Sequence, residues 1–188
     1  DINDVLYEST GKRNEKEDYE LVVDERYKET MSSLASKLCN RSVKLLRGIF
    51  GKEYGEYNET VESVLNLTSK AGIAVYNNRS YSAASYCFGA NVKLTYLLLA
   101  FEDIEEDGVR DKIKIIEKNV KKLEKSIDNK EKRTVTDLEA YSVVKERLIE
   151  AKEYKEETSK NVTDDNLYNL AYSFERVYSA FSWANFFD

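Results

Sequence analysis

The sequence predicts an all-α protein, an antiparallel bundle of about six helices in which helical-hairpin packing is an option. The chain has no proline and only seven glycines in 188 residues, so long helices can run without the breaks that proline introduces. Apolar residues recur at three- and four-residue steps along most of its length, as on one face of an α-helix. With 34% charged and 41% hydrophobic residues, the composition is that of a soluble globular domain.

The helix expected over residues 80–101 should lie at the centre of the bundle. Its apolar positions keep the helical spacing, namely Ala84, Cys87, Phe88, Leu94, Leu97, Leu98 and Phe101. Small residues at 83, 84, 89 and 90 let neighbouring helices approach closely, and apolar side chains surround much of its second half. A helix that is apolar over most of its circumference is usually enclosed by others.

The chain divides into two predicted regions. Residues 1–20 are interpreted as a connector from an upstream domain, with a brief helix that ends at Gly11, and residues 21–188 as the helical bundle domain. Because the chain begins with Asp1 rather than Met, we expect a processed product or part of a larger protein. In the bundle, one long helix should begin after Asp24 and end before Gly51, where N-cap and C-cap residues are favourable.

The remaining helices are predicted from capping residues and from apolar residues at helical spacing. A second helix should begin at Asn58 or Glu59, and the short turn at 77–79 makes the next helix antiparallel to it. An acidic link over 102–108 should lead to a fourth helix, whose regularly spaced apolar residues begin at Val109. Thr136 and Glu139 form a capping box for a fifth. Its expected inner face comprises Leu138, Tyr141, Val144, Leu148 and Ala151. Thr163 is the expected cap of the sixth.

The composition disfavours several functional classes. The net charge is −6 and the two signs are mixed along the chain, whereas nucleic-acid-binding proteins usually concentrate basic residues on one face. No apolar run approaches the roughly 18 residues of a membrane span. The chain has no histidine, the commonest general base and a frequent zinc ligand. We therefore expect no catalytic residue, no cofactor and no metal site, and a chain that is not itself an enzyme.

One acidic segment imitates a calcium loop. Asp103, Glu105 and Asp107 alternate ahead of Gly108. A calcium loop needs a bidentate Glu at its twelfth position, where this chain has Lys114. The segment is better interpreted as a link between helices.

The fourteen tyrosines are interpreted mainly as packing at the margin of the core, with binding of a partner as the alternative.

Five Asn-x-Ser/Thr triplets give the clearest indication of compartment. They begin at the candidate N-glycosylation residues Asn40, Asn58, Asn66, Asn78 and Asn161. Asn is also a common cap and turn residue, so the triplets alone leave that alternative open. Because the predicted helices and turns place these residues at exposed positions, as glycan acceptors require, we expect an extracytoplasmic protein. In such a compartment Cys39 and Cys87 could form a disulfide, or remain two buried free cysteines.

Two stretches resemble a known family. The first, residues 1–11 (DINDVLYESTG), is similar to the junction that follows the proteolytic domain of archaeal Lon-like (S16-type) serine proteases. The second, residues 81–91 (YSAASYCFGAN), resembles part of the helical region after that domain. The resemblance implies that a Ser-Lys dyad lies upstream, and no catalytic residue is carried over to this chain. It also implies membrane-associated, extracytoplasmic relatives.

These observations lead to three hypotheses. The first is a non-catalytic accessory domain of a Lon-like protease that mediates assembly or substrate access, with the Tyr-rich rims of the helices at 80–101 and after Thr163 as its working surface. The second is a free-standing helical-hairpin scaffold for a protein or peptide, as in tetratricopeptide arrays. The third, a nucleotide-handling domain resembling HEPN proteins, is disfavoured because that family's nucleases use a His. The expected partners are thus the upstream protease domain, a protein or peptide, or further copies of the chain.

Overall fold

The computed structural model describes residues 25–102, 104–158 and 163–187, and this part of the chain contains six α-helices, two short 3-10 helices and no strand. The elements are α2 (Glu25–Ile49), η1 (Gly55–Tyr57), α3 (Asn58–Tyr76), α4 (Ser80–Phe101), α5 (Glu106–Asp128), α6 (Val135–Thr158), α7 (Asp164–Ala184) and η2 (Asn185–Phe187). The expectation of an all-α bundle of about six helices is confirmed. The expected connector at 1–20, its short helix and Asp24 lie outside the described residues.

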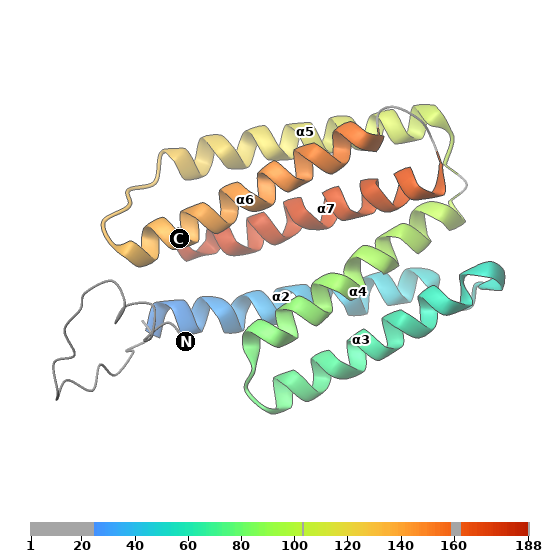
Figure 1. The fold of residues 1–188 in the computed structure, drawn as a ribbon, viewed down its shortest axis with the longest axis horizontal. Coiled ribbons are helices and arrows are strands. Elements are labelled where there is room, and N and C mark those ends of the chain that lie inside the picture. The colour runs from blue at the N-terminus through green and yellow to red at the C-terminus, as the bar shows by residue number, and fades with distance from the viewer. Residues whose placement is uncertain (1–24, 103, 159–162, 188) are drawn as a thin grey trace, which may run out of the picture.

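The six helices form two groups of three (Figure 1). α2, α3 and α4 lie on one side, and α5, α6 and α7 on the other. Within each group consecutive helices are antiparallel, because links of a few residues return the chain directly onto the preceding helix. The two groups meet chiefly where α4 and α2 pack against α7. This junction is where the candidate site lies.

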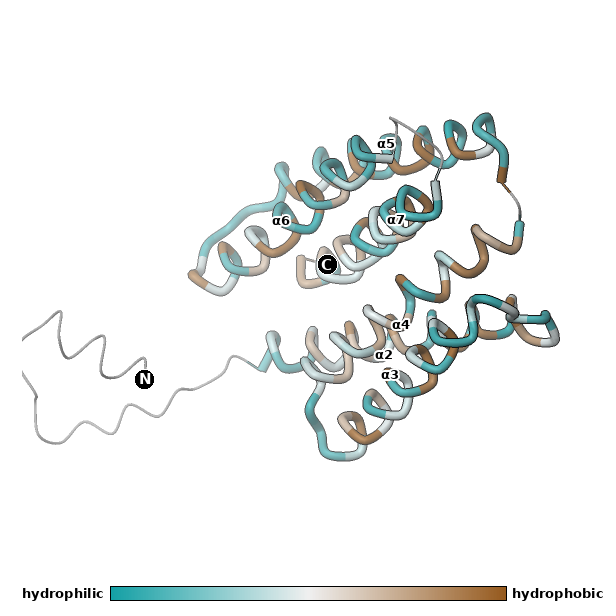
Figure 2. Tube along the Cα trace, turned by 45° about the vertical axis from the view of Figure 1, so that its right-hand side comes forward, coloured by the Kyte–Doolittle hydropathy of each residue, from teal (hydrophilic) through white to brown (hydrophobic). Residues whose placement is uncertain are grey.

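α4 is the central helix, as its composition predicts. Ala83, Ala90, Leu94 and Leu97 have no exposed surface. α2 and α3 pack on one side of α4 and α7 on another. Apolar residues therefore occur on several of its faces. Figure 2 shows hydrophobic colour along much of α4, whereas hydrophobic and hydrophilic colours alternate along α5. α5 behaves as a surface helix with one buried seam that includes Ile116, Val120 and Leu123.

The turn between α3 and α4 requires an unusual backbone conformation. Asn78 has a φ of 56°, in the left-handed region that Asn tolerates better than most residues. The backbone N–H of Arg79 then donates to the carbonyl of Ala74 at 2.8 Å. This local geometry reverses the chain within three residues and sets the antiparallel pairing of α3 and α4.

The predicted start of α5 was wrong by a few residues. The helix begins at Glu106, so Gly108 lies in its first turn rather than in the link. The first-turn N–H groups have no intrahelical partner in any helix, so a glycine costs less there than in the interior. A Cβ on Gly108 would come within 2.7 Å of Cγ2 of Ile104, which explains a residue without a side chain. Asp103 lies outside the described residues, and the rest of the calcium-like segment belongs to the start of this helix.

The predicted cap of α6 was also wrong. The capping box uses Thr134 and Asp137 instead of Thr136 and Glu139: the hydroxyl of Thr134 accepts from the N–H of Asp137 at 3.1 Å, and the carboxylate of Asp137 accepts from the N–H of Thr134 at 2.9 Å. Of the predicted inner face, Val144, Leu148 and Ala151 are fully buried, whereas Leu138 is 54% exposed and Ala140, which was not predicted, is fully buried. The cap predicted at Thr163 for α7 is confirmed, because its hydroxyl accepts from the N–H of Asn166 at 3.3 Å.

The α6 cap predicts a pH-dependent stability. The N–H of Arg133, with smaller contributions from Thr134 and Arg26, lowers the pKa of Asp137 from 3.8 to about 2. Because the folded-state pKa lies below the unfolded value, this stabilisation is present above about pH 4 and is lost as the pH falls towards about 2. We expect the difference in unfolding free energy between wild type and Asp137→Asn to shrink across that window. Urea titrations at several pH values measure it, and a difference that is constant with pH would contradict the assignment.

Candidate binding cleft between α4 and α7

A cleft of about 180 Å³ opens where the two groups of helices meet. α4 and α7 supply most of its walls, with contributions from α2 and α6. Its lining residues are Leu34, Leu38, Tyr81, Ala84, Ser85, Phe88, Arg147, Arg176, Ser179 and Trp183. The sequence predicted a working surface on the rims of the helices at 80–101 and after Thr163, which are α4 and α7.

Helical periodicity brings these residues together. Tyr81, Ser85 and Phe88 are four and three residues apart in α4, so their side chains share one face of the helix. Arg176, Ser179 and Trp183 repeat the same spacing on α7, and Leu34 and Leu38 do so on α2. The cleft is therefore built on regular helices, which hold side chains more precisely than loops do.

Two arginines give the cleft its charge. Nε of Arg176 lies 2.9 Å from Oε2 of Glu150, an ion pair without the alignment of a hydrogen bond. Nη1 of Arg147 donates to the same oxygen at 3.3 Å. The Arg147 and Arg176 side chains are only 20% and 13% exposed. Glu150 thus pairs with both guanidinium groups, and Glu146, whose side chain is 60% exposed, lies 3.8 Å from Nη1 of Arg147.

Aromatic rings fix the plane of the Arg176 guanidinium group. The guanidinium carbon of Arg176 lies 4.4 Å from the ring centre of Phe88 and 4.7 Å from that of Tyr172. Nη2 of Arg176 also donates to the hydroxyl of Tyr172. Stacking of this kind limits the rotamers of arginine and preorganises its donors. The cleft therefore combines apolar surface with positioned N–H groups.

A second groove, of about 210 Å³, lies between α5 and α6. Its charged residues compensate one another: Nζ of Lys152 is 2.7 Å from Glu124 and Nζ of Lys155 is 3.0 Å from Glu117. Because its charges are balanced and it has little aromatic surface, we interpret this groove as an ordinary helix–helix boundary. The α4–α7 cleft is the better candidate.

Among the described residues, the most deeply buried charged side chain does not line the cleft. Glu175 on α7 has no exposed surface, and Arg41 on α2 binds both of its oxygens at 2.6 Å. The hydroxyl of Thr95 on α4 donates to it at 2.7 Å, and the Arg41 guanidinium lies over the ring of Tyr178. All of these groups bind one another across three helices, so we interpret the cluster as structural. In the described part of the chain no group of three or more candidate metal ligands is present.

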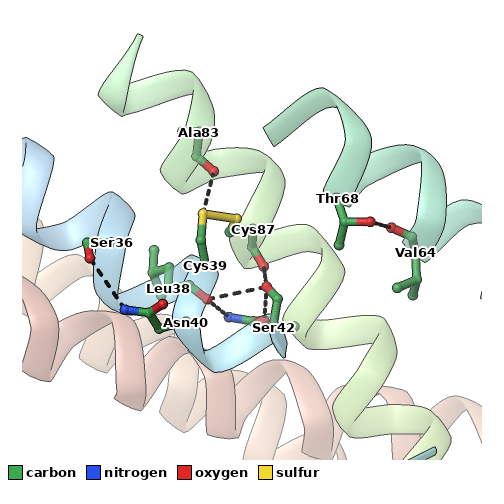
Figure 3. Close-up of a disulfide and its surroundings, with 10 residues drawn as sticks. Ser36, Leu38, Cys39, Asn40, Ser42, Val64, Thr68, Ala83 and Cys87 are labelled. Atoms are coloured by element: carbon green, nitrogen blue, oxygen red, sulfur yellow. Dashed lines mark hydrogen bonds between the residues drawn. A yellow bond between two sulfur atoms is a disulfide. The ribbon is translucent and has the colours of Figure 1, made fainter. Parts of the chain in front are cut away.

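The cysteines predicted as a candidate pair are joined by a disulfide in the structure. Their Cα atoms are 5.0 Å apart, inside the range that such a bond requires. It links α2 to α4, as Figure 3 shows. Three residues further along α2, Ser42 donates to Oδ1 of Asn91 at 2.6 Å, and the Asn91 amide donates to the carbonyl of Leu38 at 3.0 Å. The bond is thus supported by a buried polar network.

The candidate glycosylation residues differ in their surroundings. Asn40, Asn58, Asn66 and Asn78 are exposed, and Asn161 lies outside the described residues. Asn40 donates to Ser36 at 3.4 Å, as drawn in Figure 3, but the hydroxyl of its triplet belongs to buried Ser42. An enzyme acting on the folded chain would reach Asn58 and Asn78, at the start of α3 and in the α3–α4 turn, more readily than Asn40.

Arg147 and Arg176 were not predicted from the sequence as site residues. One signal was available: beyond the two aspartates of its first turn, α7 has only two charged residues, Glu175 and Arg176. A charged pair inside an otherwise apolar and small-residue helix is expected to have partners on other helices. No comparable signal marks Arg147, which is one of many charged residues in α6.

The remaining observations concern the surface. The acidic pairs Glu105–Glu106 and Glu156–Glu157 are exposed. Most tyrosines of the described part are half-buried beside the core, as predicted, whereas Tyr76 and Tyr81 are largely exposed. Among the described helices, none has the combination of length and hydrophobicity that crossing a bilayer requires.

Comparisons with known proteins add no relative: no protein-family model, no curated protein and no solved structure matches this chain.

Proposed function

We propose that this chain is a non-catalytic helical accessory domain of an extracytoplasmic Lon-like protease, and that it governs substrate access by holding an unfolded polypeptide in the α4–α7 cleft. The cleft is the observation that carries the proposal. It joins aromatic and aliphatic surface to positioned arginines, the combination enriched at protein-binding hot spots. The resemblance of residues 1–11 and 81–91 supplies the protease context, and residues 81–88 contribute the α4 wall of the cleft.

Two features support the compartment. A disulfide joins Cys39 to Cys87, and structural disulfides persist mainly in oxidising surroundings. Four of the five candidate acceptors, Asn40, Asn58, Asn66 and Asn78, have exposed positions. The alternative predicted from the sequence, a free-standing scaffold, would use the same cleft and differs only in lacking a protease domain upstream.

A binding and cleavage assay with a model unfolded protein tests the proposal. We expect fluorescein-labelled, dephosphorylated casein to bind the chain saturably, as measured by anisotropy, and to stay intact on a gel. Ser85→Trp should weaken binding at least about tenfold, because an indole at this exposed position fills the cleft mouth. Cleavage of casein would overturn the non-catalytic assignment. Equal binding by wild type and Ser85→Trp would overturn the role of the cleft.

A further inference from the structure

The α4–α7 cleft also indicates which polypeptides would bind. We propose that it recognises an extended peptide through one carboxylate side chain, which binds Arg147 and Arg176, and an adjacent apolar side chain. This inference rests on the proposed function, since it specifies the ligand of the same cleft. It follows from the charge, the donor geometry and the size of the site.

The charge of the lining is one-sided. Arg147 and Arg176 contribute two positive charges, and no Asp or Glu is among the lining residues. Glu150 pairs with both arginines and the largely exposed Glu146 lies 3.8 Å from Nη1 of Arg147, but neither carboxylate is a lining residue. Because the Arg147–Glu146 pair is long and Glu146 is largely exposed, it contributes little, and a carboxylate arriving from the open side would bind the two arginines in the lining itself. The α5–α6 groove, where lysines and glutamates are already paired, lacks this imbalance.

The two guanidinium groups retain donors for such a ligand. Each has five N–H donors in a planar fork that matches a carboxylate. Arg147 uses Nη1 for Glu150, while Arg176 directs Nε to Glu150 and Nη2 to Tyr172. Stacking on Phe88 and Tyr172 fixes the Arg176 plane before the ligand binds. Little conformational entropy is then lost on binding.

The size of the site favours side chains of a peptide over a cofactor. At about 180 Å³, the cleft is smaller than the roughly 300–1,000 Å³ of pockets for drug-sized ligands. Leu34, Leu38 and Trp183 provide an apolar floor and wall for a neighbouring side chain, and Tyr81, which is 68% exposed, stands at the rim. The net charge of −6 repels acidic ligands at long range, so any preference for a carboxylate has to come from these local contacts.

Two matched peptides test the inference. One is a blocked, labelled pentapeptide with a central glutamate flanked by leucine, and the other has glutamine in its place. We expect the glutamate peptide to bind about tenfold more tightly by anisotropy, because its hydrogen bonds are charge-assisted. Its binding should change the emission of Trp183, the only tryptophan in the sequence, which lines the cleft.

Variants at an exposed position provide the controls. Ser85→Glu supplies a carboxylate from α4 itself and should abolish the preference for the glutamate peptide, whereas Ser85→Gln should keep it. Arg147→Gln should weaken binding of the glutamate peptide about tenfold, and Arg110→Gln, at an exposed site on α5, should leave its affinity unchanged.

Equal affinities for the two peptides while casein still binds would overturn only this inference. Competition by inorganic phosphate as effective as that by the glutamate peptide would overturn the peptide assignment in favour of a general anion subsite. If the wild type binds neither the peptides nor casein, the proposed function is overturned as well.

Discussion

Replacing Cys39 and Cys87 together with alanine is expected to lower the free energy of unfolding by about 4 kcal/mol in the chain-entropy model of disulfide stabilisation. The two residues are separated by 48 positions, and the closed loop contains all of α3. Without the bond the unfolded chain gains the freedom of that loop, while α2 and α4 retain their packing in the folded state. Urea unfolding monitored by circular dichroism measures the difference.

Chemical reduction of the wild type provides the matched control, since it removes the bond without changing the side-chain atoms. Reduced wild type and the double-alanine variant should unfold at similar urea concentrations, with the oxidised wild type well above both. The two single variants, each with one free thiol, should resemble the double variant. An unfolding midpoint that reduction leaves unchanged would contradict a stabilising role of the disulfide.

The architecture was predictable because it depends on local information. The absence of proline, the three- and four-residue apolar spacing and the caps are properties of short segments, and they gave α4 its observed bounds, Ser80–Phe101. The errors came where two local signals competed. At the start of α6, Thr134 with Asp137 and Thr136 with Glu139 both fit a capping box, and only the first lets Asp137 pair with Arg26 on α2.

The cleft was not predictable to the same degree because it depends on how helices rotate against one another. The sequence indicated the rims of α4 and α7, but the positions of Arg147 and Arg176 follow from the packing of α6 on α7 and of α7 on α4. Pairing of Cys39 and Cys87 was left open for the same reason. A helical pattern places each residue on a face, and only the packed bundle shows which residues of two faces meet.

A four-residue segment of α2, residues 39–42, links the stability of the bundle to the geometry of the cleft. Cys39 is bonded to α4, Arg41 to Glu175 on α7, and Ser42 to Asn91 on α4. Glu175 precedes Arg176, and neighbouring helical residues point about 100° apart. Because Arg41 holds Glu175 towards α2, we expect it to favour the rotation of α7 that turns Arg176 into the cleft. The hypothesis is that the buried ion pair positions Arg176 in addition to any effect on stability.

Removing one partner of this ion pair should destabilise the chain strongly. In Arg41→Ala the Glu175 carboxylate, which has no exposed surface, keeps only the hydroxyl of Thr95 as a hydrogen-bond partner within the described part of the chain. Breaking a buried pair in this way typically costs about 3–5 kcal/mol. We expect a loss of that size in urea unfolding. Arg110→Ala, which breaks an exposed pair with Glu106 on α5, should have little effect because surface pairs contribute little.

A double replacement separates stability from positioning. Arg41→Met with Glu175→Leu removes both charges and keeps much of the volume, so it should be more stable than Arg41→Ala, because no buried charge is left uncompensated. If the ion pair also orients α7, the double variant should still bind the glutamate peptide more weakly than the wild type does. A stable double variant with wild-type peptide affinity would restrict the pair to a structural role. A double variant no more stable than Arg41→Ala would contradict the account of the uncompensated charge.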